Sequence, residues 1–310
     1  MQMKRRANPE PVFHGSLAMN TAGKKKVQEW LVTIPSLFWL ILLFLIPTLI
    51  VFAIAFKPPD LYGGIGAGWT LETLRSLCKA DYAIVIWRTL YLSLLTTAAC
   101  ILLATPAGYC LARTDPRWRQ ILLLLVIIPF WTSFLIRIFA WKTLLHPEGL
   151  IKKGMVFLHL VQPETSLLYN AWAVWLVMVY TFLPFAILPI YAAAEKFEFR
   201  LLEAAQDLGA RRWQSWLYIF LPGIRRGLWT AILVVFIPAL GSYVIPDIVG
   251  GPGGEMLGNK IAQRVFVDRN LPHASGLSAL LILAVLLPLL AVLVLQRKKG
   301  EAAPLIEEDA

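Results

Sequence analysis

The chain is built from long apolar runs separated by short polar segments. A membrane-spanning helix needs about 20 mostly apolar residues, and six runs reach roughly that length. They lie at residues 31–56, 89–112, 121–145, 167–194, 227–248 and 276–295. We therefore predict an all-α membrane protein with six transmembrane helices. The first run is longer than a signal-peptide core and lacks a small-residue cleavage site, so we expect it to be retained.

The composition supports a membrane protein. Of the 310 residues, 58% are hydrophobic and 15% are charged, and the mean hydropathy is +0.66. Soluble domains carry about 25% charged residues, and their limited interior volume cannot bury this much apolar surface. The formal net charge of +10 would suggest nucleic-acid binding in a soluble protein. Here the basic residues stand beside apolar runs, where they indicate topology instead.

The distribution of Lys and Arg predicts the orientation, because cytoplasmic loops carry the excess of these residues. Both termini and the segments at 113–119 and 195–226 are richer in Lys and Arg than the alternate loops. We therefore predict that both termini are cytoplasmic. The expected organisation is a cytoplasmic tail (1–29), a six-helix permease domain (30–296) and a second cytoplasmic tail (297–310).

The sequence contains no recognisable catalytic motif. The three cysteines form no C-x-x-C pair, and the HExxH and GxSxG patterns are absent. The closest approach to a phosphate-binding loop is GGEMLGNK at 253–260, where Asn259 separates the required glycine from Lys260. We therefore expect no metal site, no bound cofactor and no enzymatic activity in this chain.

The segment at 195–226 is unusually polar for this chain. Residues 197–208 have a helical pattern of apolar and polar positions, and we expect Gly209 to end that helix in a left-handed conformation. A second short helix is expected at 211–220, with Pro222 discouraging its continuation. One interpretation is an amphipathic helix lying among lipid headgroups. The other is a docking surface for a protein.

A motif in this segment favours the docking surface. The order E-A-A, three residues, G, nine residues, I-x-L-P resembles the signature of the integral-membrane subunits of bacterial ABC importers. The matching residues are Glu203, Ala204, Ala205, Gly209, Ile219, Leu221 and Pro222. The resemblance implies a type I importer architecture, in which this segment is the coupling helix that docks on a cytoplasmic ATPase dimer.

The same resemblance implies the other partners. ATP and Mg²⁺ would be bound by the ATPase, and a second, different permease subunit would complete the path. A soluble binding protein would deliver the substrate to the outer side. The alternative, from a different class, is a secondary transporter that works without ATP.

Two further stretches suggest the substrate. WTSFLIR (131–137) and VVFIPALGSYVIPDIVGGP (234–252) resemble the larger permease of polyamine importers, of the putrescine or spermidine type. Permeases for anions and other small solutes share the fold and remain an alternative.

A polyamine is a flexible cation, which carboxylates and aromatic faces would bind. The candidate path residues are Trp131, Arg137, Tyr180, Tyr243 and Asp247. Charged groups inside a membrane are usually paired or functional. We therefore predict an ion pair between Arg137 and Asp247.

Overall fold

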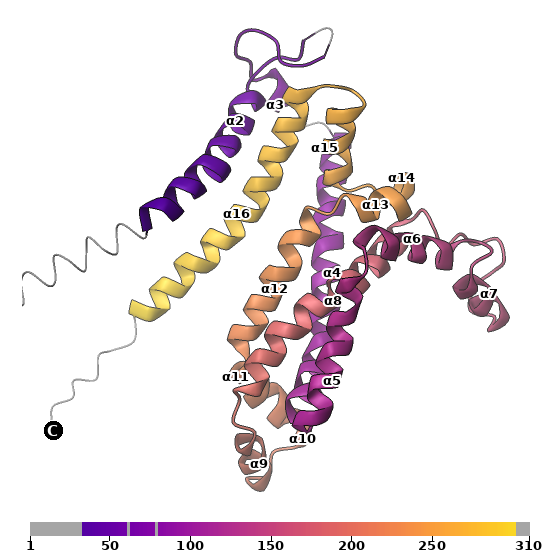
Figure 1. Cartoon of the computed structure of the whole chain (residues 1–310), viewed down its shortest axis with the longest axis vertical. Helices are drawn as coiled ribbons and strands as arrows, with labels where there is room; N and C mark the ends of the chain where they lie inside the picture. Colours follow the sequence, from indigo (N-terminus) through magenta and orange to yellow (C-terminus); the bar gives the residue numbers. More distant parts are fainter. Residues whose placement is uncertain (1–32, 61–62, 78–79, 302–310) are drawn as a thin grey trace, which may run out of the picture. The chain divides into compact units, whose positions relative to one another are not determined.

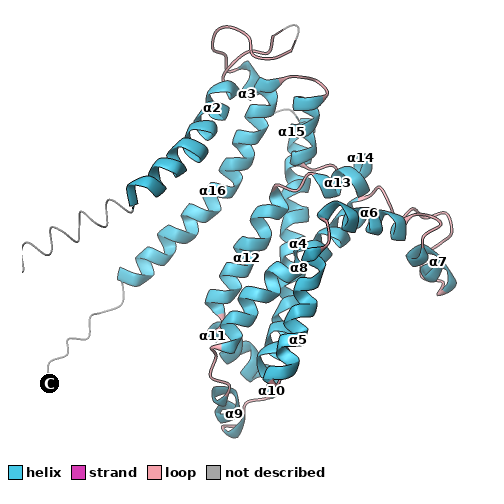
Figure 2. Cartoon of the chain, in the orientation of Figure 1, coloured by secondary structure: helices cyan, strands magenta, loops and turns pink. Residues whose placement is uncertain are grey.

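A computed structural model of the chain describes residues 33–60, 63–77 and 80–301. The described residues are helical, and their one β-feature is an isolated bridge between Pro59 and Ile65. Figure 2 shows helices joined by loops throughout this part of the chain. The all-helical fold is therefore confirmed. The predicted tail at 1–29 lies outside the described residues, as does most of the tail at 297–310.

The chain divides into two compact units, residues 1–53 and 54–310. The first apolar run forms a helix from Thr33 to Ala55, close to the predicted 31–56. Within this helix, η1 (Ile41–Leu45) is a π-helical turn and α2 (Ile46–Ala55) is regular.

Three helices of the second unit form its core: α4 (Ala80–Arg113), α8 (Ala171–Glu195) and α12 (Arg225–Leu240). They pack against one another, as Figure 1 shows. Two glycines allow their close approach. A Cβ on Gly108 would lie 2.8 Å from Ile190 Cγ2, and one on Gly227 would lie 2.4 Å from Ala193 Cβ. Small residues at such crossings let membrane helices pack closely.

The predicted third span, 121–145, is wrong as a single straight helix. The chain instead forms α5 (Pro116–Ile127), η2 (Ile128–Trp131) and α6 (Phe134–Leu145). The helical direction changes by 91° across the break. Pro129 removes a backbone donor there, and Thr132 is extended, with a ψ of 150°. The Thr132 hydroxyl donates to the Pro129 carbonyl at 2.8 Å, which stabilises the break.

The predicted fifth span, 227–248, is also interrupted. α12 ends at Leu240, and the chain continues through three shorter helices before the last long one. The three shorter helices are α13 (Val244–Val249), α14 (Gly251–Gly254) and α15 (Leu257–Phe266), and the last long helix is α16 (Leu271–Glu301). Among the described residues, three helices are long and apolar enough to cross a membrane, or five if each of two bent pairs counts as one span. The count of six spans stays a prediction.

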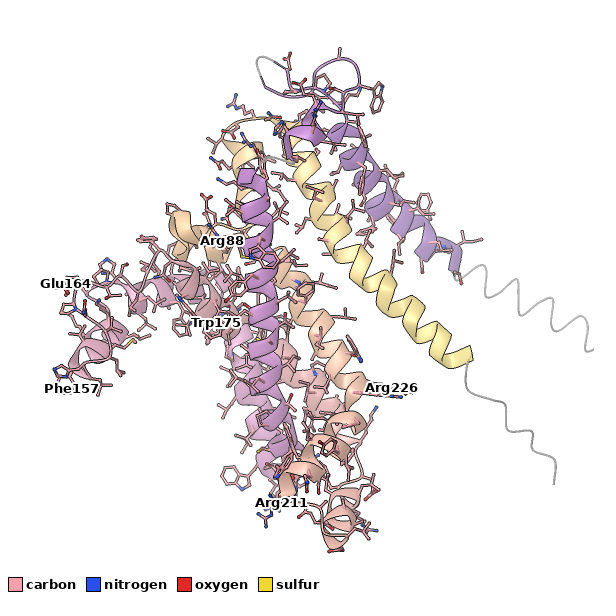
Figure 3. The ribbon with its side chains drawn as sticks, turned by 180° about the vertical axis from the view of Figure 1, so that it is seen from behind. Arg88, Phe157, Glu164, Trp175, Arg211 and Arg226 are labelled. Carbon is pink, nitrogen blue, oxygen red and sulfur yellow. The ribbon has the colours of Figure 1, made fainter. Side chains whose placement is uncertain are left out.

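A projecting arm follows α6. It consists of α7 (Leu150–Phe157) and the loop that leads to α8. Figure 3 shows the labelled Phe157 and Glu164 on this arm, away from α4. The buried Lys152 ammonium donates to the Gln162 carbonyl at 3.0 Å and also to the Thr165 carbonyl. One lysine therefore ties the loop back onto α7.

We expect Lys152→Met to loosen this loop. The change removes two hydrogen bonds from a charged donor, and each such bond contributes about 1.5–3 kcal/mol. Hydrogen exchange of the amides between 158 and 168 should accelerate several-fold. Lys153→Met is the matched control, since the Lys153 side chain is 61% exposed and pairs with Glu148 at the surface. Equal exchange rates in the two variants would contradict the tether.

Candidate functional site

The segment at 195–226 lies at the end of the second unit opposite α15 (Figure 1). It contains α9 (Arg200–Asp207), α10 (Arg212–Ser215), the π-helical η3 (Trp216–Phe220) and α11 (Leu221–Gly223). Gly209 has a φ of +92°, and its N–H donates to the Gln206 carbonyl at 2.9 Å. The prediction that Gly209 ends the first helix in a left-handed conformation is confirmed.

α9 presents two different faces. Leu202 is buried against the core cluster, which attaches the helix to the unit. Glu203, Ala204 and Gly209 are exposed, and Ala205 is half-buried. Leu208 beside them is 89% exposed. The exposed face therefore combines one carboxylate with small and apolar side chains, a composition suited to contact with another protein surface.

The second half of the motif has a different role. Ile219 and Leu221 are partly buried and pack against the core, whereas Pro222 is exposed. The helical run ends one residue after Pro222, at Gly223, close to the predicted end. Pro222 stands in the first turn of α11, where a missing backbone donor is tolerated. The chain turns after Gly223, where the direction changes by 71°.

An aromatic cluster attaches the segment to the core helices. We give this name to the set Tyr109, Phe197, Phe199, Trp216 and Phe220. Phe220 lies at its centre and is fully buried. Its ring centroid is 5.0 Å from that of Tyr109 and 5.4 Å from that of Phe197, both edge-on. Such edge-to-face contacts are favourable beyond simple burial. The cluster joins α4, the entry to α9 and η3 in one packed unit.

Charged groups surround the aromatic cluster. Arg113 donates to the Tyr109 hydroxyl at 2.7 Å, and its guanidinium lies 5.8 Å from the Phe199 ring centroid. Arg119 and Glu195 form an ion pair at 2.7 Å that links α5 to the end of α8. The segment is therefore held to α4 by aromatic and cation–π contacts and to α5 by the ion pair at its first residue.

We expect Gly223→Ala to disturb this packing. A Cβ at Gly223 would lie 2.4 Å from Phe197 Cε2, so the ring must move, and overpacking costs about 1–3 kcal/mol. The thermal unfolding midpoint should fall. Gly154→Ala on α7 is the control, since a Cβ there meets nothing within 4 Å. A Gly223→Ala protein as stable as wild type would contradict the packing role.

The predicted path residues do not form one site. Trp131 ends η2 and is exposed. Tyr180 on α8 packs edge-on against Trp141 at 5.3 Å. Tyr243 and Asp247 lie together in a separate pocket.

The predicted ion pair between Arg137 and Asp247 is wrong. Within the described residues, no ion pair of 4.0 Å or less joins them. The Arg137 guanidinium instead lies 5.4 Å from the ring centroid of Phe130. The prediction rested on both residues mapping to the outer half of the membrane. They lie on α6 and α13, which are in contact, but the Arg137 side chain is directed to aromatic rings of its own neighbourhood.

The pocket at α13 is the second candidate site. It has a volume of about 350 Å³ and lies between α13, α14 and α15. We call it the acidic pocket. The side chains that concern its chemistry are Tyr243, Asp247, Glu255, Asn259, Gln263 and Phe266. Sequence reasoning missed the residues from α15, although Asn259 and Gln263 are spaced to share one helical face.

The acidic pocket is fixed to the long helix α4. The Leu257 N–H donates to the Thr89 hydroxyl at 2.8 Å. Arg88, labelled in Figure 3, donates to the Pro252 carbonyl at 3.1 Å. The stretch at 253–260 is divided between α14 and α15, so it does not form a phosphate-binding loop. The described residues contain no cluster of three or more metal-ligating side chains.

The chain is similar to known membrane transport proteins. Residues 101–298 match the profile of the family described as "Binding-protein-dependent transport system inner membrane component". The chain is 36% identical to the spermidine/putrescine transport system permease protein PotB of Haemophilus influenzae, over 77% of this chain and 84% of the relative. It is 32% identical to PotB of Escherichia coli K12, over 81% and 92%.

Solved structures share the fold. A bacterial ABC transporter involved in the import of the acidic polysaccharide alginate aligns with a TM-score of 0.64 and 19% identity, over 93% of this chain and all of that one. The same kind of transporter in complex with a substrate-bound periplasmic protein aligns with a TM-score of 0.63 and 20% identity, over 85% and 93%. At these identities the similarity concerns the fold alone.

Proposed function

The chain belongs to the family of inner membrane components of binding-protein-dependent transport systems, and on that premise we propose that it is a polyamine import permease. Its substrate would be putrescine or spermidine. The observation that carries this proposal is the 36% identity to a spermidine/putrescine permease over 77% of the chain. The protein is an integral component of the bacterial inner membrane. It would form half of the path, and a second, different permease would form the other half.

We propose that the segment at 195–226 docks on a cytoplasmic ATPase dimer, with both termini on the same side of the membrane. The exposed Glu203, Ala204 and Leu208 support this role, because a buried helix could not receive a partner. The ATPase would bind ATP and Mg²⁺, and this chain would bind neither. A periplasmic binding protein would deliver the polyamine to the opposite end.

In this proposal, the aromatic cluster transmits the movement of the docked segment. Phe220 contacts rings from α4 and from the entry to α9, so displacement of α9 is resisted by close packing rather than absorbed by a flexible loop. Protein interiors are packed densely enough to transmit such strain. The transport path would then respond at the other end of α4.

The test is to purify the chain with the proteins that accompany it and to reconstitute the complex in vesicles. We expect a co-purifying ATPase whose ATP hydrolysis is stimulated by a polyamine-loaded binding protein. Putrescine, spermidine and sulfate should be compared side by side, with uptake of the first two. Uptake without nucleotide would favour the ATP-independent transporter, and sulfate uptake alone would favour an anion permease.

A further inference from the structure

The acidic pocket contains a carboxylate without a cationic partner. Among the described residues, no Lys, Arg or His nitrogen lies within 4.0 Å of the Asp247 carboxylate. Arg137, the expected partner, faces aromatic rings instead. This carboxylate shares the pocket with the aromatic residues Tyr243 and Phe266, in a chain with a formal net charge of +10. It is suited to bind a cation from outside the chain.

Asn259 positions this carboxylate. Its amide nitrogen donates to the Tyr243 carbonyl at 3.1 Å and lies 3.5 Å from Asp247 Oδ1. Its amide oxygen accepts from the Met256 N–H at 3.2 Å. The start of α15 is in turn bound to α4 through Thr89. The ends of α13 and α15 that frame the exposed Asp247 carboxylate are therefore fixed by a hydrogen-bond network.

The neighbouring carboxylate already holds an alkylammonium group. Lys260 Nζ lies 2.8 Å from Glu255 Oε2 and 3.2 Å from Gln263 Oε1. Glu255 and Gln263 both line the acidic pocket. A primary ammonium on a flexible alkyl chain is chemically what a polyamine terminus presents. The lysine thus marks a position that accepts such a group.

We propose that the acidic pocket binds a diamine through two ammonium positions, a role that rests on the proposed polyamine transport. Asp247 and the Tyr243 ring receive one ammonium, and Glu255 with Gln263 receives the other. Lys260 occupies the second position in the absence of substrate and is displaced from it on binding. The volume of about 350 Å³ falls within the range of about 300–1,000 Å³ usual for small-molecule sites. Charge-assisted hydrogen bonds and ring faces supply the attraction.

The arrangement explains a preference for diamines over monoamines. A monoamine has one ammonium group. It gains the contact with Asp247 and has no second ammonium to replace that of Lys260. A diamine replaces the lysine ammonium with its own and keeps both carboxylates neutralised. The exchange conserves charge at Glu255, so its cost is small compared with the burial of an unpaired charge.

The experiment measures equilibrium binding of labelled putrescine to the complete transporter complex in nanodiscs, without the binding protein. Asp247→Asn should weaken binding by about tenfold or more, the effect of losing a charge-assisted hydrogen bond. Lys260→Met should strengthen it several-fold, because the internal competitor is gone. Glu164→Gln on the projecting arm removes an equal charge outside the pocket and should change nothing. Retained assembly and thermal midpoint serve as folding controls.

Binding of butylamine tests whether the pocket uses one ammonium position or two. Butylamine carries a single ammonium on the same carbon chain, so it should bind about tenfold more weakly than putrescine. Glu255→Gln should remove most of that difference. Three results would overturn the proposed diamine site. They are wild-type affinity in Asp247→Asn, no gain of affinity in Lys260→Met, and no putrescine binding to the wild-type complex. If the complete system still took up putrescine despite one of these results, the proposed transport function would stand without the diamine site in the acidic pocket. Absence of all polyamine uptake would refute the function itself.

Discussion

Gly209→Pro is expected to abolish polyamine uptake while leaving the chain folded in the membrane. Proline fixes φ near −65°, whereas Gly209 has a φ of +92°. The substitution also removes the N–H that donates to the Gln206 carbonyl at 2.9 Å. The chain cannot then reverse after α9. The exposed face with Glu203 and Ala204 will lose its orientation toward the ATPase.

The expected magnitude follows from the backbone conflict. A residue forced out of a left-handed conformation costs about 1–3 kcal/mol, and a coupling loss of that size corresponds to about 5–150-fold. Uptake into vesicles should fall at least tenfold, and ATP hydrolysis should no longer respond to the loaded binding protein. Basal ATP hydrolysis by the ATPase should persist.

Gly68→Pro is the matched control for this variant. Gly68 has a φ of +93°, and like Gly209 it has open space where a Cβ would stand. The backbone conflict is therefore similar, but the site is in the loop before α3 (Glu72–Leu77). Uptake should be largely retained. If both variants failed equally, general misfolding rather than lost docking would explain the result.

Phe220→Ala is expected to destabilise the chain and to uncouple the segment at 195–226. The side chain is fully buried and touches four other rings of the aromatic cluster. Truncation of a buried Phe costs about 3–5 kcal/mol. The cavity also removes the contact through which, in the proposed mechanism, α9 acts on α4. We therefore expect a lower thermal midpoint together with reduced uptake per ATP hydrolysed.

The ratio of uptake to ATP hydrolysis separates coupling from stability. Both rates should be measured well below the unfolding midpoint of the variant, where a purely structural defect leaves the ratio unchanged. Phe220→Leu should restore much of the ratio, because it refills most of the cavity. Phe157→Ala on the projecting arm is the control, since Phe157 is 81% exposed. An unchanged ratio in Phe220→Ala would argue against transmission through the aromatic cluster.

Local chemistry determined a large part of this protein. The membrane class and the helices α4 and α8 follow from hydrophobicity alone, since lipid demands long apolar helices with internally satisfied backbones. The end of α9 at Gly209 also follows from sequence, because only glycine adopts that φ without strain. The motif that begins at Glu203 pointed to the same family as the profile match over residues 101–298.

Tertiary structure alone decided how distant residues meet. Tyr109, Phe197 and Phe220 form one cluster although they are far apart in the sequence. The spacing of apolar residues along the chain does not predict such a contact. The 91° break near Pro129 was hidden because proline in a membrane helix often produces a mild bend instead. Although α6 and α13 are in contact, Arg137 faces Phe130 and Phe134 rather than Asp247. The same geometry left Asp247 beside Asn259 and Glu255 in a pocket, since side-chain pairing depends on helix direction and not on apolar content.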